Sequence, residues 1–99
     1  ALLFTDIEGS TRLWSEDRER MSRALAVHDA LARSAVEGHR GVVVKMTGDG
    51  MYAVFGDPVD AVATALELQR ALAGTASTNS VALRVRCGLH AGLGKRPVA

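Results

Sequence analysis

The sequence predicts an α+β fold, a sandwich in which helices cover one mixed β-sheet. Short apolar runs typical of strands lie at 2–4, in two parts of 42–55 and at 81–89. Between them lie two longer segments, 10–37 and 58–73, in which apolar residues recur at helical spacing. Strands and helices that follow one another in this way pack as a sheet with helices on its face.

The first apolar run, Leu2 to Phe4, ends in an acid and a small polar turn. We expect a buried strand, then Asp6 at its tip, then a turn of Gly9, Ser10 and Thr11 that opens a helix, because Ser and Thr cap helices and Gly allows tight turns. A carboxylate beside free N–H groups suits a metal-bound phosphate. Asp is also common in turns for structural reasons alone, and that alternative stays open.

The segment up to about residue 37 predicts a short helix and then a long one. The buried stripe of the long helix is formed by residues at helical spacing: Met21, Leu25, His28, Ala32 and Ala35. We interpret His28 as a packed helix residue and not as a ligand, because no Cys or second His lies near it at metal-binding spacing.

Residues 42–55 predict a β-hairpin, since two apolar runs are joined by Gly48-Asp49-Gly50. Asp49 is either a turn former or, if the hairpin lies beside the first strand, a second carboxylate that converges with Asp6. Two such acids could hold Mg²⁺ or Mn²⁺ with a polyphosphate. Lys45 interrupts a valine-rich strand, so it either faces outward or contacts a ligand.

The remaining chain predicts one more helix and one more strand. Asp57 fits the N-cap and Pro58 the first position of a helix that ends near residue 73. Apolar residues then alternate strictly along 81–89. The order β-α-α-β-β-α-β suggests a ferredoxin-like arrangement, which can place Asp6 and Asp49 near the same end of the sheet.

Length and composition restrict the class of protein. At 99 residues the chain is one domain at most, and we expect it to be a piece of a longer domain or a short version of one. The net charge of +1 and the aromatic content of 4% argue against a nucleic-acid partner. The single cysteine, Cys87, fits a cytoplasmic location, and no apolar run approaches the ~20 residues that span a membrane.

Three separated motifs, at 4–11, 45–50 and 86–92, together resemble the class III adenylate/guanylate cyclase catalytic domain. They read Phe-Thr-Asp-Ile-Glu-Gly-Ser-Thr, Lys-Met-Thr-Gly-Asp-Gly and Arg-Cys-Gly-Leu-His-Ala-Gly. Their order and spacing are similar to the first half of that domain. Residues 1–99 would therefore be a partial domain, its N-terminal, metal-binding half.

The resemblance implies a phosphorus–oxygen lyase of signal transduction that converts ATP to 3′,5′-cyclic AMP and pyrophosphate. It implies that Asp6 and Asp49 are catalytic and bind two Mg²⁺ or Mn²⁺ ions, together with the backbone carbonyl of Ile7. One ion would activate the ribose 3′-hydroxyl and the other would hold the triphosphate. Amides of the turn at 9–11 would support the phosphates.

Lys45 resembles the family lysine that contacts adenine, so the resemblance favours ATP over GTP. Family sites lie between two subunits, which implies a homodimer. The family's second half supplies an Asp, an Asn and an Arg that are not found here. This departure leaves an alternative: an inactive cyclase-like module that binds nucleotide or dimerises and regulates an attached output domain. A third hypothesis is a structural domain in which Asp6 and Asp49 are turn residues only.

Overall fold

The computed structural model describes residues 1–75 and 83–90, and its elements follow the predicted order. They are β1 (Leu2–Ile7), α1 (Ser10–Glu16), α2 (Arg18–Gly38), β2 (Val42–Met46), β3 (Gly50–Val54), α3 (Pro58–Thr75) and β4 (Val85–His90). The small polar residues at 74–80 are typical of a loop, and those at 76–80 lie outside the described residues. Residues 81–82 of the predicted strand and the end of the third motif, beyond residue 90, also lie outside.

The four strands form one sheet in the order β2-β3-β1-β4. This topology confirms the predicted α+β fold class, but it differs from the prediction in one respect. The sheet was expected to be mixed, and each of its three pairings is antiparallel. The reason lies in the connections: β1 and β2 run in the same direction with β3 between them, and β3 and β4 run in the same direction with β1 between them. No two parallel strands are therefore neighbours.

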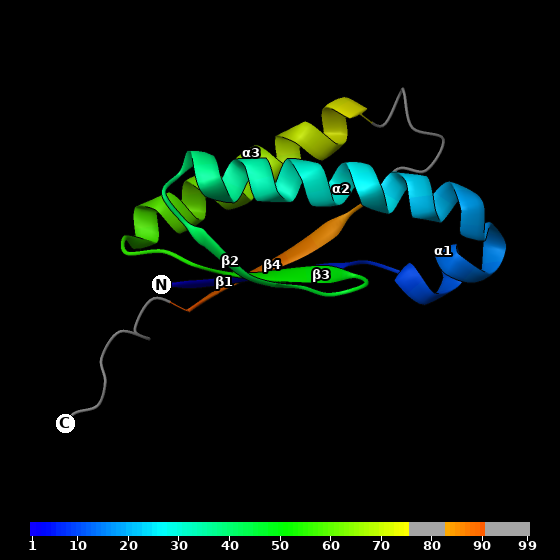
Figure 1. Cartoon of the computed structure of the whole chain (residues 1–99), viewed down its shortest axis with the longest axis horizontal. Helices are drawn as coiled ribbons and strands as arrows, with labels where there is room; N and C mark the ends of the chain where they lie inside the picture. The colour runs from blue at the N-terminus through cyan, green and yellow to red at the C-terminus, as the bar shows by residue number, and fades with distance from the viewer. Residues whose placement is uncertain (76–82, 91–99) are drawn as a thin grey trace.

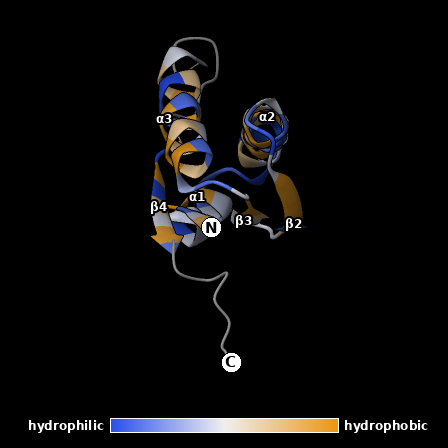
Figure 2. Cartoon of the chain, turned by 90° about the vertical axis from the view of Figure 1, so that its left-hand side faces the viewer, coloured by the Kyte–Doolittle hydropathy of each residue, from blue (hydrophilic) through white to orange (hydrophobic). Residues whose placement is uncertain are grey.

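Both long helices lie on one face of the sheet, as Figure 1 shows. Viewed from the end of the sheet, α2 packs above β2, and α3 packs above β1 and β4 (Figure 2). Neither of these long helices contacts the other face, and we call it the open face. Side chains alternate accordingly along β1: Leu3, Thr5 and Ile7 are buried under the helices, whereas Phe4 and Asp6 lie on the open face.

The helices follow the patterns expected of them. The buried stripe of α2 consists of Met21, Ala24, His28, Ala32, Ala35 and Val36. His28 is fully buried and its Nδ1 lies 2.9 Å from Oδ1 of Asp29, which confirms its interpretation as a packed helix residue.

Asp57 caps α3 by accepting a hydrogen bond from the Val59 N–H at 2.9 Å. Over the described residues, no helix is both long and apolar enough to cross a membrane.

Two element ends differ from their predicted positions. Helix α3 extends to Thr75 and so includes Gly74, which the sequence had suggested for a loop. Strand β4 begins at Val85, although alternation begins at residue 81. Ile7 is the last residue of β1 and pairs with Val85, so the described residues 83 and 84 have no strand partner on β1.

Gly50 marks the closest approach of the hairpin to β1. It pairs with Asp6, and a Cβ atom at this position would lie 2.1 Å from the carbonyl oxygen of Thr5. That oxygen belongs to the backbone of the central strand and cannot move aside alone. Gly48 lies in the same turn, where a Cβ would meet nothing within 4 Å.

We therefore expect Gly50→Ala to lower the free energy of unfolding by about 1–3 kcal/mol, as overpacking does in close-packed interiors. Gly48→Ala is the matched control, and its effect should stay within about 0.5 kcal/mol. Urea denaturation of the full chain, followed by circular dichroism, measures both. Equal stability of the two variants would contradict the strand register described here.

Candidate functional site

The end of β1 and the β2–β3 turn meet at one end of the sheet, close to α1 (Figure 1). Asp6 lies opposite Gly50 in the strand register, and the Ile7 N–H donates a hydrogen bond to the Asp49 carbonyl at 2.7 Å. The backbones that carry the two acids are thus hydrogen-bonded to each other. The structure brings Asp6, Ile7 and Asp49 together, as the order of elements had predicted.

Two hydroxyl groups hold the Asp49 carboxylate. Ser10 donates to its Oδ2 and Thr47 donates to its Oδ1, each at 3.3 Å. These distances are long for bonds between a hydroxyl and a carboxylate, whose usual length is about 2.7–2.8 Å. The hydroxyls therefore orient the carboxylate loosely and leave lone pairs on both oxygens free. Sequence reasoning missed Thr47, although its position two residues before Asp49 is typical of a side chain that bonds within a turn.

The turn after β1 opens α1 as predicted, but the expected Ser or Thr cap does not form. Gly9 is the N-cap, in a left-handed conformation with φ of 65°, and it makes no side-chain cap bond. Ser10 is the first residue of α1, and its hydroxyl points to Asp49 instead. Thr11 lies exposed on the same helix. A residue with a side chain would be strained at position 9, which explains why glycine stands there.

Asp6 has a different partner. The guanidinium of Arg86, on β4, donates through Nη2 to Oδ2 of Asp6. The two residues lie directly opposite each other in the β1–β4 register. The side chains of Asp6 and Arg86 remain 44% and 67% exposed, so this ion pair lies on the open face in contact with water. The sequence placed Arg86 on the outer face of its strand but gave no strand register, and its acid partner was therefore missed.

Lys45 reaches the open face because β2 contains a bulge. The register shifts between Val43 and Lys45, so that Lys45 pairs with Tyr52. In a regular pairing of the same residues without the bulge, Val44 would lie opposite Tyr52, and Lys45 would lie opposite the buried Met51 and face the helices. The bulge thus turns the charged side chain away from the core. Among residues 1–75 and 83–90, no carboxylate forms an ion pair with Lys45.

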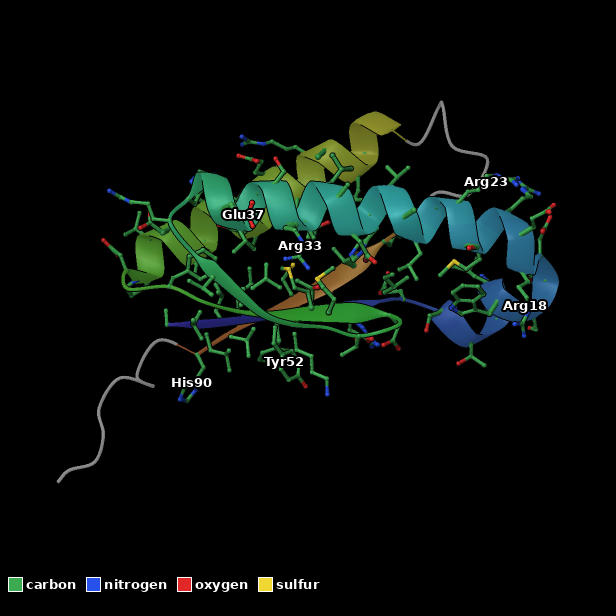
Figure 3. All side chains as sticks on the ribbon, in the orientation of Figure 1. Arg18, Arg23, Arg33, Glu37, Tyr52 and His90 are labelled. Atoms are coloured by element: carbon green, nitrogen blue, oxygen red, sulfur yellow. The ribbon has the colours of Figure 1, made fainter. Side chains whose placement is uncertain are left out.

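An aromatic pair lies beside Lys45 on the open face, because Tyr52 is its partner on β3 and Phe4 is the partner of Tyr52 on β1. The rings of Phe4 and Tyr52 meet edge to face, with centroids 6.3 Å apart. Figure 3 shows that Tyr52 and His90 project from the sheet on the side away from the helices. Gly88 lies opposite Phe4, where a Cβ would come within 2.3 Å of the ring. The open face therefore combines aromatic rings with charged side chains.

The donor atoms suit a hard divalent cation. Asp6, Asp49 and the carbonyl of Ile7 offer only oxygen, the ligand that Mg²⁺ and Mn²⁺ prefer. Within the described parts of the chain, no group of three or more His, Cys, Asp or Glu side chains could form a closed metal cage. Mg²⁺ commonly binds one or two carboxylates and completes its shell with water and substrate phosphates. The residues present fit such an open site.

The one cysteine does not add a nucleophile to this site. Cys87 pairs with Thr5 in the strand register and accepts a hydrogen bond from Nε2 of Gln69 at 3.6 Å. Burial raises the pKa of the Cys87 thiol, and the hydrogen bond from Gln69 lowers it by less. The thiol therefore stays protonated near neutral pH, and protonated thiols are poor nucleophiles.

The sequence of the chain is similar to those of several curated proteins. An uncharacterised protein of Mycobacterium tuberculosis is 40% identical over 93 residues, which cover 92% of this chain and 30% of that protein. The receptor-type adenylate cyclase GRESAG 4.2 of Trypanosoma brucei brucei is 41% identical over 68 residues, 69% of this chain and 12% of that protein. The chain thus spans less than a third of these relatives.

Solved structures share the fold. The guanylyl cyclase Cya2 superposes with a TM-score of 0.77 at 25% identity, over 88% of this chain and 50% of that one. An adenylate cyclase from Trypanosoma brucei, solved in its monomeric state, has a TM-score of 0.77 at 28% identity, over 88% and 53% of the two chains. The family model of the adenylate and guanylate cyclase catalytic domain matches residues 1–95. The chain therefore belongs to the family of adenylate and guanylate cyclase catalytic domains.

Proposed function

We propose that this chain is part of an adenylate cyclase that converts ATP to 3′,5′-cyclic AMP and pyrophosphate in the cytoplasm, where ATP is available. The observation that carries the proposal is the convergence of Asp6 and Asp49 at one end of the sheet, within a chain of the cyclase family. The chain spans about half of the solved cyclases, with 50% and 53% coverage. We propose accordingly that residues 1–99 are one portion of a larger catalytic domain.

In this proposal Asp6, Asp49 and the Ile7 carbonyl hold Mg²⁺ or Mn²⁺, two ions in each site. When bound, such cations supply Lewis-acid chemistry for the attacking ribose hydroxyl and neutralise charge on the phosphates. The protein's own contribution is to fix the ligands. The Ile7–Asp49 backbone bond sets the spacing of the two acids, and the hydroxyls of Ser10 and Thr47 orient the second one. Amides of the turn at 9–11 would face the phosphates.

We propose that Lys45 selects the base. An ammonium group can donate to N1 of adenine, which is an acceptor, but it meets a second donor at N1–H of guanine. The exposed position of Lys45 on the open face leaves its amine available for such a contact. It lies on the edge strand β2, where a second copy of the chain could approach it, and this is consistent with a site completed by that copy. Exposed apolar residues on the same face support a homodimer: Phe4, Val42, Val44 and Tyr52.

We expect Asp6→Asn and Asp49→Asn each to lower cyclic AMP formation at least about 100-fold, because an amide keeps the size of the side chain but loses the charge that stabilises the reaction. The measurement is cyclic AMP formation from Mn·ATP by the full chain. Asp57→Asn is the matched control: it removes one acid at the far end of the sheet, and Asn serves almost equally well as an N-cap.

Unchanged activity in the Asp49→Asn variant would contradict the metal assignment. If the wild-type chain binds Mn·ATP but forms no cyclic AMP, a regulatory nucleotide-binding module becomes the better account. Nucleotide binding by equilibrium dialysis, carried out on the same samples, distinguishes these two results.

Lys45→Glu should reduce the preference for ATP over GTP, measured as the ratio of the two kcat/KM values, by at least about tenfold. An acid at this position repels the N1 acceptor of adenine and accepts from N1–H of guanine. Arg70→Glu is the control, since it makes the same reversal of charge at an exposed position on α3, away from the open face. A ratio that changes equally in both variants would mean that Lys45 does not contact the base.

Mixing the Lys45→Glu variant with the Asp49→Asn variant, each of which should turn over ATP poorly, tests the shared site. In a two-fold dimer of Lys45→Glu with Asp49→Asn, one of the two sites receives both intact residues and the other receives neither. Random pairing of equal amounts should therefore restore roughly a quarter of the wild-type rate with ATP. The absence of any recovery, although the variants exchange subunits by light scattering or cross-linking, would argue against a site built from two chains.

A further inference from the structure

The two acids of the site differ in the partners that hold them. Asp49 accepts hydrogen bonds from two neutral hydroxyls, those of Ser10 and Thr47. Asp6 instead forms an ion pair with Arg86. Within the described parts of the chain, no cation pairs with Asp49. One carboxylate is thus open to a metal ion, whereas an oxygen of the other already binds a positive group.

The pairing of β1 with β4 fixes the position of Arg86 beside Asp6. Asp6 and Arg86 are direct partners on neighbouring strands, and both side chains leave the sheet on its open face. Gln69 of α3 donates to the Val85 carbonyl at 3.0 Å, which ties β4 to the helix just before Arg86. The guanidinium is therefore held beside Asp6 by the same register that builds the site.

A divalent ion at Asp6 would sit about 2.1 Å from a carboxylate oxygen, the usual distance for Mg²⁺. The guanidinium is within hydrogen-bond distance of the same carboxylate, so both positive groups would lie only a few ångströms apart. Their repulsion opposes metal binding unless the guanidinium leaves. It can leave at modest cost, because both side chains are substantially exposed and an exposed ion pair is weak.

We propose that Arg86 is a positioning residue that holds Asp6 in the metal-free chain and that a divalent cation must displace. This inference rests on the proposed function, since it needs Asp6 to be a metal ligand. Arg86 then has two effects on the site before a metal ion binds. It keeps the Asp6 carboxylate turned towards β4, and it lowers the affinity of the site for a metal ion that arrives without nucleotide.

The test is a titration of the full chain with Mn²⁺ in the absence of nucleotide, at low salt, with free Mn²⁺ measured by electron paramagnetic resonance. Arg86→Gln removes the charge but keeps a polar side chain that can donate a hydrogen bond, and it should lower the Kd for Mn²⁺ by about tenfold. Arg33→Gln is the matched control: it removes the same charge from an exposed position on α2, which covers the opposite face. Its Kd should stay within about twofold of the wild type.

A second readout separates displacement from a general change of charge. Saturating Mn²⁺ should raise the Tm of Arg86→Gln more than that of the wild type, because the variant loses no ion pair when the metal binds. Mn²⁺ binding that is equal or weaker in Arg86→Gln would overturn this inference and leave the proposed function intact. Binding by neither protein, or binding that Asp49→Asn does not weaken, would contradict the proposed metal site itself.

Discussion

The central position of β1 is the constraint on which the site depends. This strand pairs with β3 on one side and with β4 on the other, and both pairings are antiparallel. Its two neighbours therefore bring their own residues to the end where β1 stops: β3 brings the turn that carries Asp49, and β4 brings Arg86. Asp6 therefore lies beside residues from segments far apart in the sequence, because β1 has a paired strand on each side.

The two faces of the sheet have different roles: one contributes to stability and the other carries polar and aromatic groups. One face is covered by α2 and α3 and supplies stability through residues such as Leu3 and Ile7. The open face is not covered by α2 or α3, so it carries charged and aromatic groups without burying them under these helices. The site lies where the open face meets the end of β1, so its acids are anchored by a packed strand and still reach solvent.

Much of the fold and part of the candidate site could be predicted from the sequence, because hydrophobic periodicity and turn residues indicate local structure directly. The order of elements and the adjacency of Asp6 and Asp49 follow from apolar patterns and from one Asp-Gly turn. The pairing of Asp6 with Arg86 could not be predicted, because it depends on the register of strands 80 residues apart, which no local pattern records. The bulge at Val44 was missed for a related reason: an extra valine in a valine-rich strand leaves no mark on the pattern.

That bulge places an unusual restriction on β2. Because side chains alternate with a period of two, Val44 reverses the phase of the strand, and the residues before and after it follow opposite rules of exposure. The same residues could pair with β3 in a second way, without the bulge, with Val44 opposite Tyr52 and Lys45 opposite Met51. That pairing would turn an ammonium group into the core under the helices, where burying a charge is costly. The charge of Lys45 therefore selects one of two possible registers of the hairpin, whatever else this side chain does.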